Sequence, residues 1–179
     1  SGPGAGPDRG GKWTVVRAKA EGVTPGFNVR DARGDVWVVK FDPPGFQGLP
    51  TRAGVVCNRI LHAAGYNVPE DVMVTFRRED LVLGPGVKLR LPGGVRRDMT
   101  EADLDQILAR VERLPGGEHL AIASKFLPGT PLGPFDYEGR RDDDSNDHVD
   151  HENRRELRGL RVFAAWLLHF DTKQHNSLD

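Results

Sequence analysis

The sequence predicts an α+β protein: an antiparallel sheet with helices over residues 12–126, and a hinge with the start of a helical region over 127–179. Three observations predict it. Short runs of alternating apolar residues, separated by turns rich in Gly and Pro, fill the first part of the chain. A helical pattern follows the third run, and a longer apolar helical pattern lies near the end. Strands followed by helices are typical of an α+β fold.

The first element is a meander of three strands. Residues 13–18, 27–30 and 36–40 read as short strands with turn residues between them, and the third run ends at Lys40. Residues 1–11 contain five glycines, two prolines and no large apolar side chain, so we expect a disordered leader there. The apolar side chains on both faces of residues 36–39 predict a strand covered on both sides.

A helix and further strands follow. Thr51 is the expected N-cap of a helix that Gly65 ends. Residues 72–76, 81–83 and 87–91 have the composition of strands. Thr100 begins a second helix that runs to about Leu114, and residues 120–126 form another strand.

In the last third of the chain we expect an irregular connection followed by a helix. Residues 127–134 are rich in Pro and Gly and predict an irregular hinge. Residues 139–150 are polar and acidic, which favours an exposed loop and leaves cation binding as the alternative. An amphipathic helix is expected over 151–169, with its apolar face at residues 157–167.

The composition limits the classes of partner that we expect for this chain. The chain of 179 residues has 25 basic and 26 acidic side chains, so its overall charge does not favour nucleic acid. No apolar run is long enough to cross a membrane, and we expect a soluble protein, either cytoplasmic or exported after removal of a signal segment. The single cysteine, Cys57, lies in an apolar stretch and is expected to be a buried thiol rather than a nucleophile.

The segment His169–Asn176 carries the main functional signal. It contains Asp171, a lysine two residues later (Lys173) and an asparagine five residues later (Asn176). In phosphoryl transfer an aspartate at this spacing accepts the proton of an attacking hydroxyl, the lysine neutralises the transferred phosphate, and the asparagine holds magnesium. His169 is the expected orienting residue of the loop, by hydrogen bonding. The alternative is a helix end whose polar residues are merely solvated.

A second signal lies in the meander. Lys40 ends a strand, where a lysine that pairs with ATP phosphates would lie, although an ordinary exposed lysine is the alternative. Gly22 and Gly26 flank a turn between two strands and would let backbone N–H groups approach phosphates. A plain hairpin loop is the alternative for these glycines, because their spacing is not GxGxxG and Pro25 lacks an N–H.

A metal-dependent hydrolase is a weaker alternative. Imidazole and carboxylate groups crowd the end of the chain, and both are zinc ligands. No HExxH motif accompanies them, however. The residues concerned are His148, His151, His169, Asp171 and His175.

Three segments, residues 36–43, 62–69 and 169–176, are similar to the atypical branch of the protein-kinase-like superfamily that includes HipA-type and phosphoinositide-kinase-like proteins, among them uncharacterised bacterial ones. The resemblance implies a kinase-like N-lobe before a hinge, followed by a partial C-lobe. It implies ATP and Mg as cofactors, with adenine near Ser124 and Phe126, and an unknown protein or small molecule as the phosphoacceptor.

The sequence departs from that family in two places. The expected helix from Thr51 has no acid to pair with Lys40, so Glu21 or Glu70 is the expected substitute. The sequence also ends three residues after Asn176, before a second metal-binding aspartate. We therefore expect a fragment whose apolar face at 157–167 is covered by a missing C-terminal portion or by a partner. A pseudokinase or nucleotide-binding interaction module without turnover is the alternative function.

Overall fold

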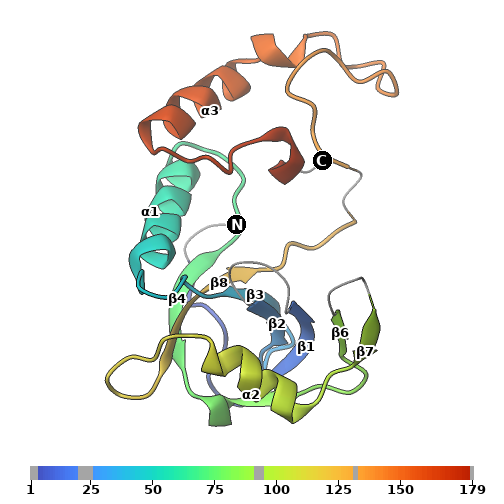
Figure 1. Ribbon diagram of the computed structural model, residues 1–179. Coiled ribbons are helices and arrows are strands. Elements are labelled where there is room, and N and C mark those ends of the chain that lie inside the picture. Colours follow the sequence, from blue (N-terminus) through green and yellow to red (C-terminus); the bar gives the residue numbers. More distant parts are fainter. Residues whose placement is uncertain (1–3, 20–25, 91–94, 131–132, 178–179) are drawn as a thin grey trace. The chain divides into compact units, whose positions relative to one another are not determined.

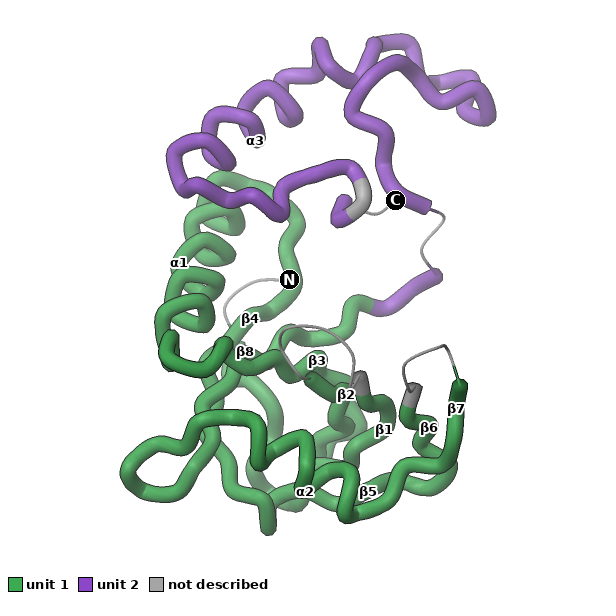
Figure 2. The backbone as a smooth tube through the Cα atoms, in the orientation of Figure 1, with its two compact units in different colours: residues 1–127 green, residues 128–179 purple. Residues whose placement is uncertain are grey.

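The computed structural model describes residues 4–19, 26–90, 95–130 and 133–177 (Figure 1). The chain forms two compact units, residues 1–127 and residues 128–179 (Figure 2). Strands lie in the first unit, and the second contains one α-helix, α3 (Arg155–Trp166), among the described residues. The fold class is α+β, as the sequence predicts. None of the helices in the described ranges is long and apolar enough to cross a membrane.

A six-stranded sheet organises the first unit. Its strand order is β4-β8-β3-β2-β1-β5, and every neighbouring pair is antiparallel except β1 and β5. The strands are β1 (Trp13–Lys19), β2 (Gly26–Arg30), β3 (Val36–Lys40), β4 (Asp71–Phe76), β5 (Leu81–Leu83) and β8 (His119–Lys125). The predicted meander of β1, β2 and β3 is therefore present.

One face of this sheet carries the core. Trp37 and Val39 of β3 and Phe27 of β2 are almost fully buried, together with residues of α2 (Glu101–Ala109) such as Leu104. Along β3 the intervening Val38 is half-buried and Lys40 is exposed. The prediction that this strand is covered on both sides was wrong. The period of two sends alternate side chains to opposite faces, and only one face has a full cover.

Helix α1 (Leu49–Ala63) follows β3 and lies beside β4 (Figure 1). Its N-cap is Gly48, so the prediction that Thr51 caps it was wrong. The buried carboxylate of Asp42 accepts the N–H groups at the start of the helix instead. Asp42 accepts hydrogen bonds from Gly48 N (2.6 Å), Thr51 N (2.8 Å) and Thr51 Oγ1 (2.7 Å). A negative charge at the first turn is favoured by the helix dipole.

Helix α2 begins where predicted but ends sooner. Thr100 and Asp103 form a capping box, and Arg97 donates two hydrogen bonds to the Asp103 carboxylate (2.6 and 2.5 Å). Arg97 is the main reason that the pKa of Asp103 is held far below its ordinary value. The helix stops at Ala109 rather than near Leu114, because a turn closed by Leu114 N and Glu118 O (2.8 Å) leads the chain back into β8.

A small hairpin of β6 (Lys88–Arg90) and β7 (Arg96–Asp98) completes the first unit. Strand β7 is polar and exposed, and no sequence pattern predicts it.

In the second unit the predicted helix over 151–169 is interrupted. Residues His151–Asn153 form a 3₁₀ turn, Arg154 is extended, and α3 begins only at Arg155. The apolar side chains of α3 are not buried: Val162 is 68% and Trp166 69% exposed.

Candidate functional site

In the first unit, Lys40 lies on the sheet face opposite the aromatic core. Its strand neighbours in register are Gly26 on β2 and Ile122 on β8, and it is exposed. The next row on the same face contains Val38 of β3, Ser124 of β8 and Asp71 of β4. Lys40 therefore shares a sheet face with a hydroxyl and a carboxylate that come from two other strands.

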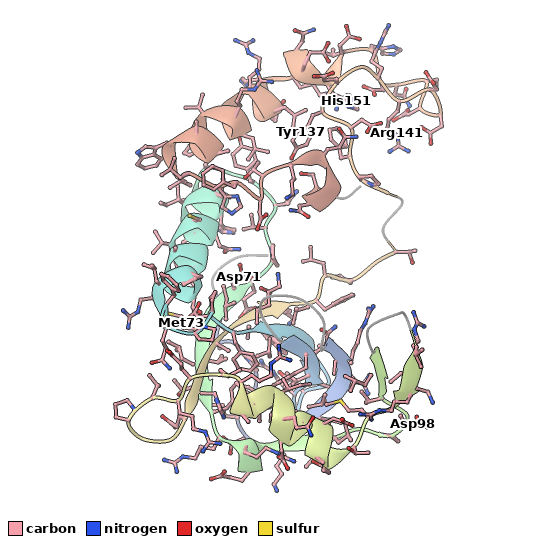
Figure 3. The ribbon with its side chains drawn as sticks, viewed as in Figure 1. Asp71, Met73, Asp98, Tyr137, Arg141 and His151 are labelled. Atoms are coloured by element: carbon pink, nitrogen blue, oxygen red, sulfur yellow. The ribbon has the colours of Figure 1, made fainter. Side chains whose placement is uncertain are left out.

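Asp71 is the acid on this face, and Figure 3 shows it on β4 beside α1. Asn58 of α1 donates from Nδ2 to Asp71 Oδ2 (3.1 Å) and to the carbonyl of Pro69 (3.0 Å). Burial raises the pKa of the Asp71 carboxyl, while Ser124, the Lys40 ammonium and Asn58 favour its ionised form and partly offset that rise. Among the described residues, its other oxygen, Oδ1, is buried without a hydrogen-bond partner.

Gly26 begins β2 directly opposite Lys40. A Cβ atom at this position would lie 2.8 Å from the carbonyl oxygen of Val39, so only glycine allows β2 to approach β3 this closely. The close packing of β2 on β3 therefore accounts for glycine at position 26, in addition to the predicted role of Gly26 in phosphate binding. Gly22, its predicted partner, lies outside the described residues, as does Glu21.

The two residues expected near adenine lie at the end of β8. Ser124 faces Asp71, while Phe126 follows the strand with a ring that is 54% exposed. The Phe126 N–H donates to Val36 O (2.8 Å) and the Lys125 N–H to Glu70 O (2.8 Å). These two amides are used inside the unit, so a base bound here would need other backbone groups.

In the second unit, the loop after α3 brings three predicted residues together. Lys173 Nζ lies 3.5 Å from Asp171 Oδ1, and Asn176 Nδ2 donates to the backbone oxygen of Asp171 (3.0 Å). Both charged side chains reach solvent, with Asp171 79% and Lys173 58% exposed. The turn of Gln174–Asn176 returns the asparagine toward the aspartate. The loop thus gathers a carboxylate, an ammonium and an amide at one surface.

His169 orients this loop locally. Its Nδ1 bonds the hydroxyl of Thr172 (2.6 Å), and its carbonyl accepts from Thr172 N (3.2 Å). The residue before it, Leu168, has φ 51°, a left-handed conformation that costs a leucine free energy. The bonds from His169 N to Ala164 O (2.9 Å) and from Leu168 N to Ala165 O (3.4 Å) form a Schellman motif that ends α3. The reversal places Asp171 just beyond the helix.

Residues 135–137 hold the far end of the loop. Phe135 N donates to Ser177 O (2.8 Å), the Tyr137 and Ser177 hydroxyls are hydrogen-bonded, and Gln174 donates to the Asp136 carboxylate. A cavity of about 160 Å³ lies beside this loop. Its lining includes Tyr137, Thr172 and two α3 arginines, Arg158 and Arg161.

The polar segment 139–150 is not simply an exposed loop, and this prediction was wrong in part. Asp147 and His151 are buried, and His151 Nε2 bonds Asp147 Oδ2 (2.7 Å) while its Nδ1 bonds Asp136 O. Arg154 also pairs with Asp147. The hydrogen bond from Arg141 N is the main cause that lowers the pKa of Asp147 to about 2, and His151 and Arg154 lower it further. Figure 3 shows His151 in this part of the unit.

This buried pair was missed because Asp147 stands among acids that are solvated. The only signal in the sequence is the spacing of four residues between Asp147 and His151. Within the ranges that the structure describes, no group of three or more His, Cys, Asp or Glu side chains is arranged to hold a metal ion. Cys57 is half-buried on α1.

Searches of protein-family models, curated proteins and solved structures gave no match for this chain. The candidate functional residues are therefore the two groups just described, Lys40 with Asp71 in one unit and Asp171 with Lys173 and Asn176 in the other.

Proposed function

We propose that this chain belongs to a phosphotransferase of kinase-like architecture that uses ATP with magnesium and acts on a hydroxyl acceptor. The observation that carries the proposal is the grouping of Asp171, Lys173 and Asn176 in one surface loop. Each residue type matches a need of phosphoryl transfer, which depends mainly on positioning and on neutralising charge.

In this proposal Asp171 accepts the proton of the acceptor hydroxyl. Its carboxylate is exposed and so can be reached by an incoming hydroxyl. Lys173 lies beside it and would move its ammonium to the transferred phosphoryl group. His169 bonds Thr172 and so acts as a positioning residue for the loop.

Asn176 is the residue that would hold magnesium. Its amide nitrogen is used by the Asp171 backbone, and the amide oxygen remains as the group that could ligate a cation. Magnesium on a nucleotide needs few protein ligands, because phosphate oxygens and water complete its shell. A group of three protein ligands is therefore not required.

Lys40 would bind the α- and β-phosphates from the first unit. It stands at the end of the third strand of the meander, exposed on the face opposite the core and followed in sequence by a helix. This arrangement matches the strand lysine of kinases in its order along the chain. Gly26 faces it, and Ser124 and Phe126 lie at the end of β8 for the base.

Nucleotide binding is tested by thermal unfolding of the full chain with ATP, with and without MgCl₂. At 100 times the dissociation constant a ligand stabilises the folded state by about 2.7 kcal/mol. We expect stabilisation that needs magnesium and that Lys40→Ala and Asn176→Ala weaken. The matched controls are Lys12→Ala and Asn153→Ala, exposed residues of the same types in the same two units, which should behave like wild type. Equal loss in the controls would contradict the proposal.

Turnover is tested by transfer of the γ-phosphate to candidate hydroxyl compounds and to water. Asp171→Asn should reduce transfer by about 10²-fold or more while keeping ATP binding. Binding of ATP without transfer in wild type would favour the alternative, a nucleotide-binding module without turnover, for which the absence of an acid from α1 is the motivating observation.

A further inference from the structure

The acid that should accompany Lys40 is missing from its expected place. Helix α1 has the sequence LPTRAGVVCNRILHA, which contains no aspartate or glutamate. Of the two substitutes that the sequence offers, Glu21 lies outside the described residues. The Glu70 carboxylate accepts a hydrogen bond from Gly6 N (2.9 Å) and so holds the N-terminal segment.

Asp71, the residue after Glu70, lies on the same sheet face as Lys40. β8 lies between β3 and β4, and its residues Ile122 and Ser124 stand in register with Lys40 and Asp71, respectively. The two strands are thus about 10 Å apart with an offset of two residues, or about 7 Å, along the same sheet face. The lysine and aspartate side chains together can span most of that separation, and the Lys40 ammonium favours the ionised form of the Asp71 carboxylate.

The Asp71 carboxylate is also incompletely satisfied. Asn58 and Ser124 interact with it, yet Oδ1 has no hydrogen-bond partner within the described residues. A buried carboxylate oxygen without a partner is costly, and an approaching ammonium group would remove that cost.

We propose that Asp71 is the acid that positions Lys40 for the phosphates, and that Asn58 links this acid to helix α1. The inference rests on the function proposed above. Helix α1 then influences Lys40 through the side-chain amide of Asn58 rather than through a carboxylate of its own. Asp71 is a positioning residue, because it acts through Lys40.

The first experiment measures the pairing without nucleotide. The side-chain carboxyl of Asp71 is titrated by ¹³C NMR in the full chain, with Asp71→Asn used to assign its signal. In Lys40→Gln the pKa of Asp71 should rise by roughly half a unit or more, because an attracting charge has been removed. Lys125→Gln is the matched control, since Lys125 pairs with Asp35 at 2.8 Å, and should leave the Asp71 titration unchanged. An unchanged midpoint in Lys40→Gln would overturn the proposal.

The second experiment separates positioning from structure. Asp71→Asn should weaken ATP·Mg binding about tenfold, while stability stays equal or rises because a buried charge has been removed. Asp71→Glu should recover part of the affinity. Asp98→Asn, in which an exposed carboxylate paired with Lys88 is changed, is the control and should keep full affinity.

The possible failures are distinguishable. If wild type binds ATP·Mg and Asp71→Asn binds it equally well, the role of Asp71 is wrong and the proposed function stands. If Lys40 and Asp71 are coupled in the titration but wild type binds no nucleotide, the proposed function fails and the positioning role fails with it.

Discussion

Replacing Asp42 by asparagine tests how α1 is attached to the strand that carries Lys40. The carboxylate accepts three hydrogen bonds, one on Oδ2 from Gly48 N and two on Oδ1 from Thr51. An asparagine can keep the Thr51 bonds on its oxygen, but its NH₂ group then faces the Gly48 N–H. One charge-assisted bond is lost, and two donors are left opposed.

The magnitude follows from these contacts. A hydrogen bond to a charged group contributes about 1.5–3 kcal/mol, and a negative charge at a helix N-terminus adds about 0.3–1 kcal/mol. We expect Asp42→Asn to lower the free energy of unfolding of the first unit by about 2 kcal/mol. With a slope of about 2 kcal/mol per molar urea, the midpoint should fall by about 1 M.

Urea unfolding followed by tryptophan fluorescence measures this loss. Trp13 and Trp37 are 3% and 0% exposed and report on the first unit, whereas Trp166 is 69% exposed and belongs to the second. A Trp166→Phe background therefore isolates the relevant signal. Asp105→Asn is the control, because its carboxylate is 60% exposed and, among the described residues, bonds the Arg78 side chain alone, so the expected loss is below about 0.5 kcal/mol. Equal midpoints for the two variants would refute the reasoning.

Two further predictions concern the stability of each unit. Leu168→Gly should raise the free energy of unfolding of the second unit by about 0.5–1 kcal/mol, because glycine relieves the left-handed strain at φ 51°. Gly65→Ala at the equivalent position of α1 (φ 93°) should lower that of the first unit by a similar amount, so the shifts in thermal unfolding should have opposite signs. Burial opposes the ionisation of Asp31, but hydrogen bonds such as that from Asp8 N outweigh it and hold its pKa below the ordinary value. The stabilising effect of the Asp31 carboxylate is therefore full above about pH 4 and is lost as the pH falls through the folded pKa. The urea midpoints of wild type and Asp31→Asn should converge between about pH 5 and about pH 2. A constant difference between the two midpoints would count against this prediction.

The strands of the meander could be predicted because their signal is local. In β3 the run of apolar residues predicts the strand itself, whereas which face is covered, with Trp37 and Val39 in the core and Lys40 exposed, is a property of the fold. The loop around Asp171 could also be predicted, since its three residues lie within six positions of one another.

Features that depend on distant partners could not be predicted. Thr51 looked like an N-cap because the true capping group, Asp42, stands nine residues away in sequence. Asp71 and Glu70 are adjacent acids, and only the pairing of β4 with β8 determines which of them lies on the same sheet face as Lys40. Strand β7 forms because its backbone pairs with β6, although its own side chains carry no strand pattern.

The central claim is that the loop from Asp171 to Asn176 takes part in binding ATP with its metal ion. Paramagnetic broadening by MnATP measures it, because Mn²⁺ weakens the NMR signals of nearby nuclei. We expect MnATP to broaden selectively the signals from Asp171 to Asn176, and CaATP to broaden none of them. No selective broadening of these signals by MnATP, or equal broadening by MnCl₂ alone, would contradict the claim.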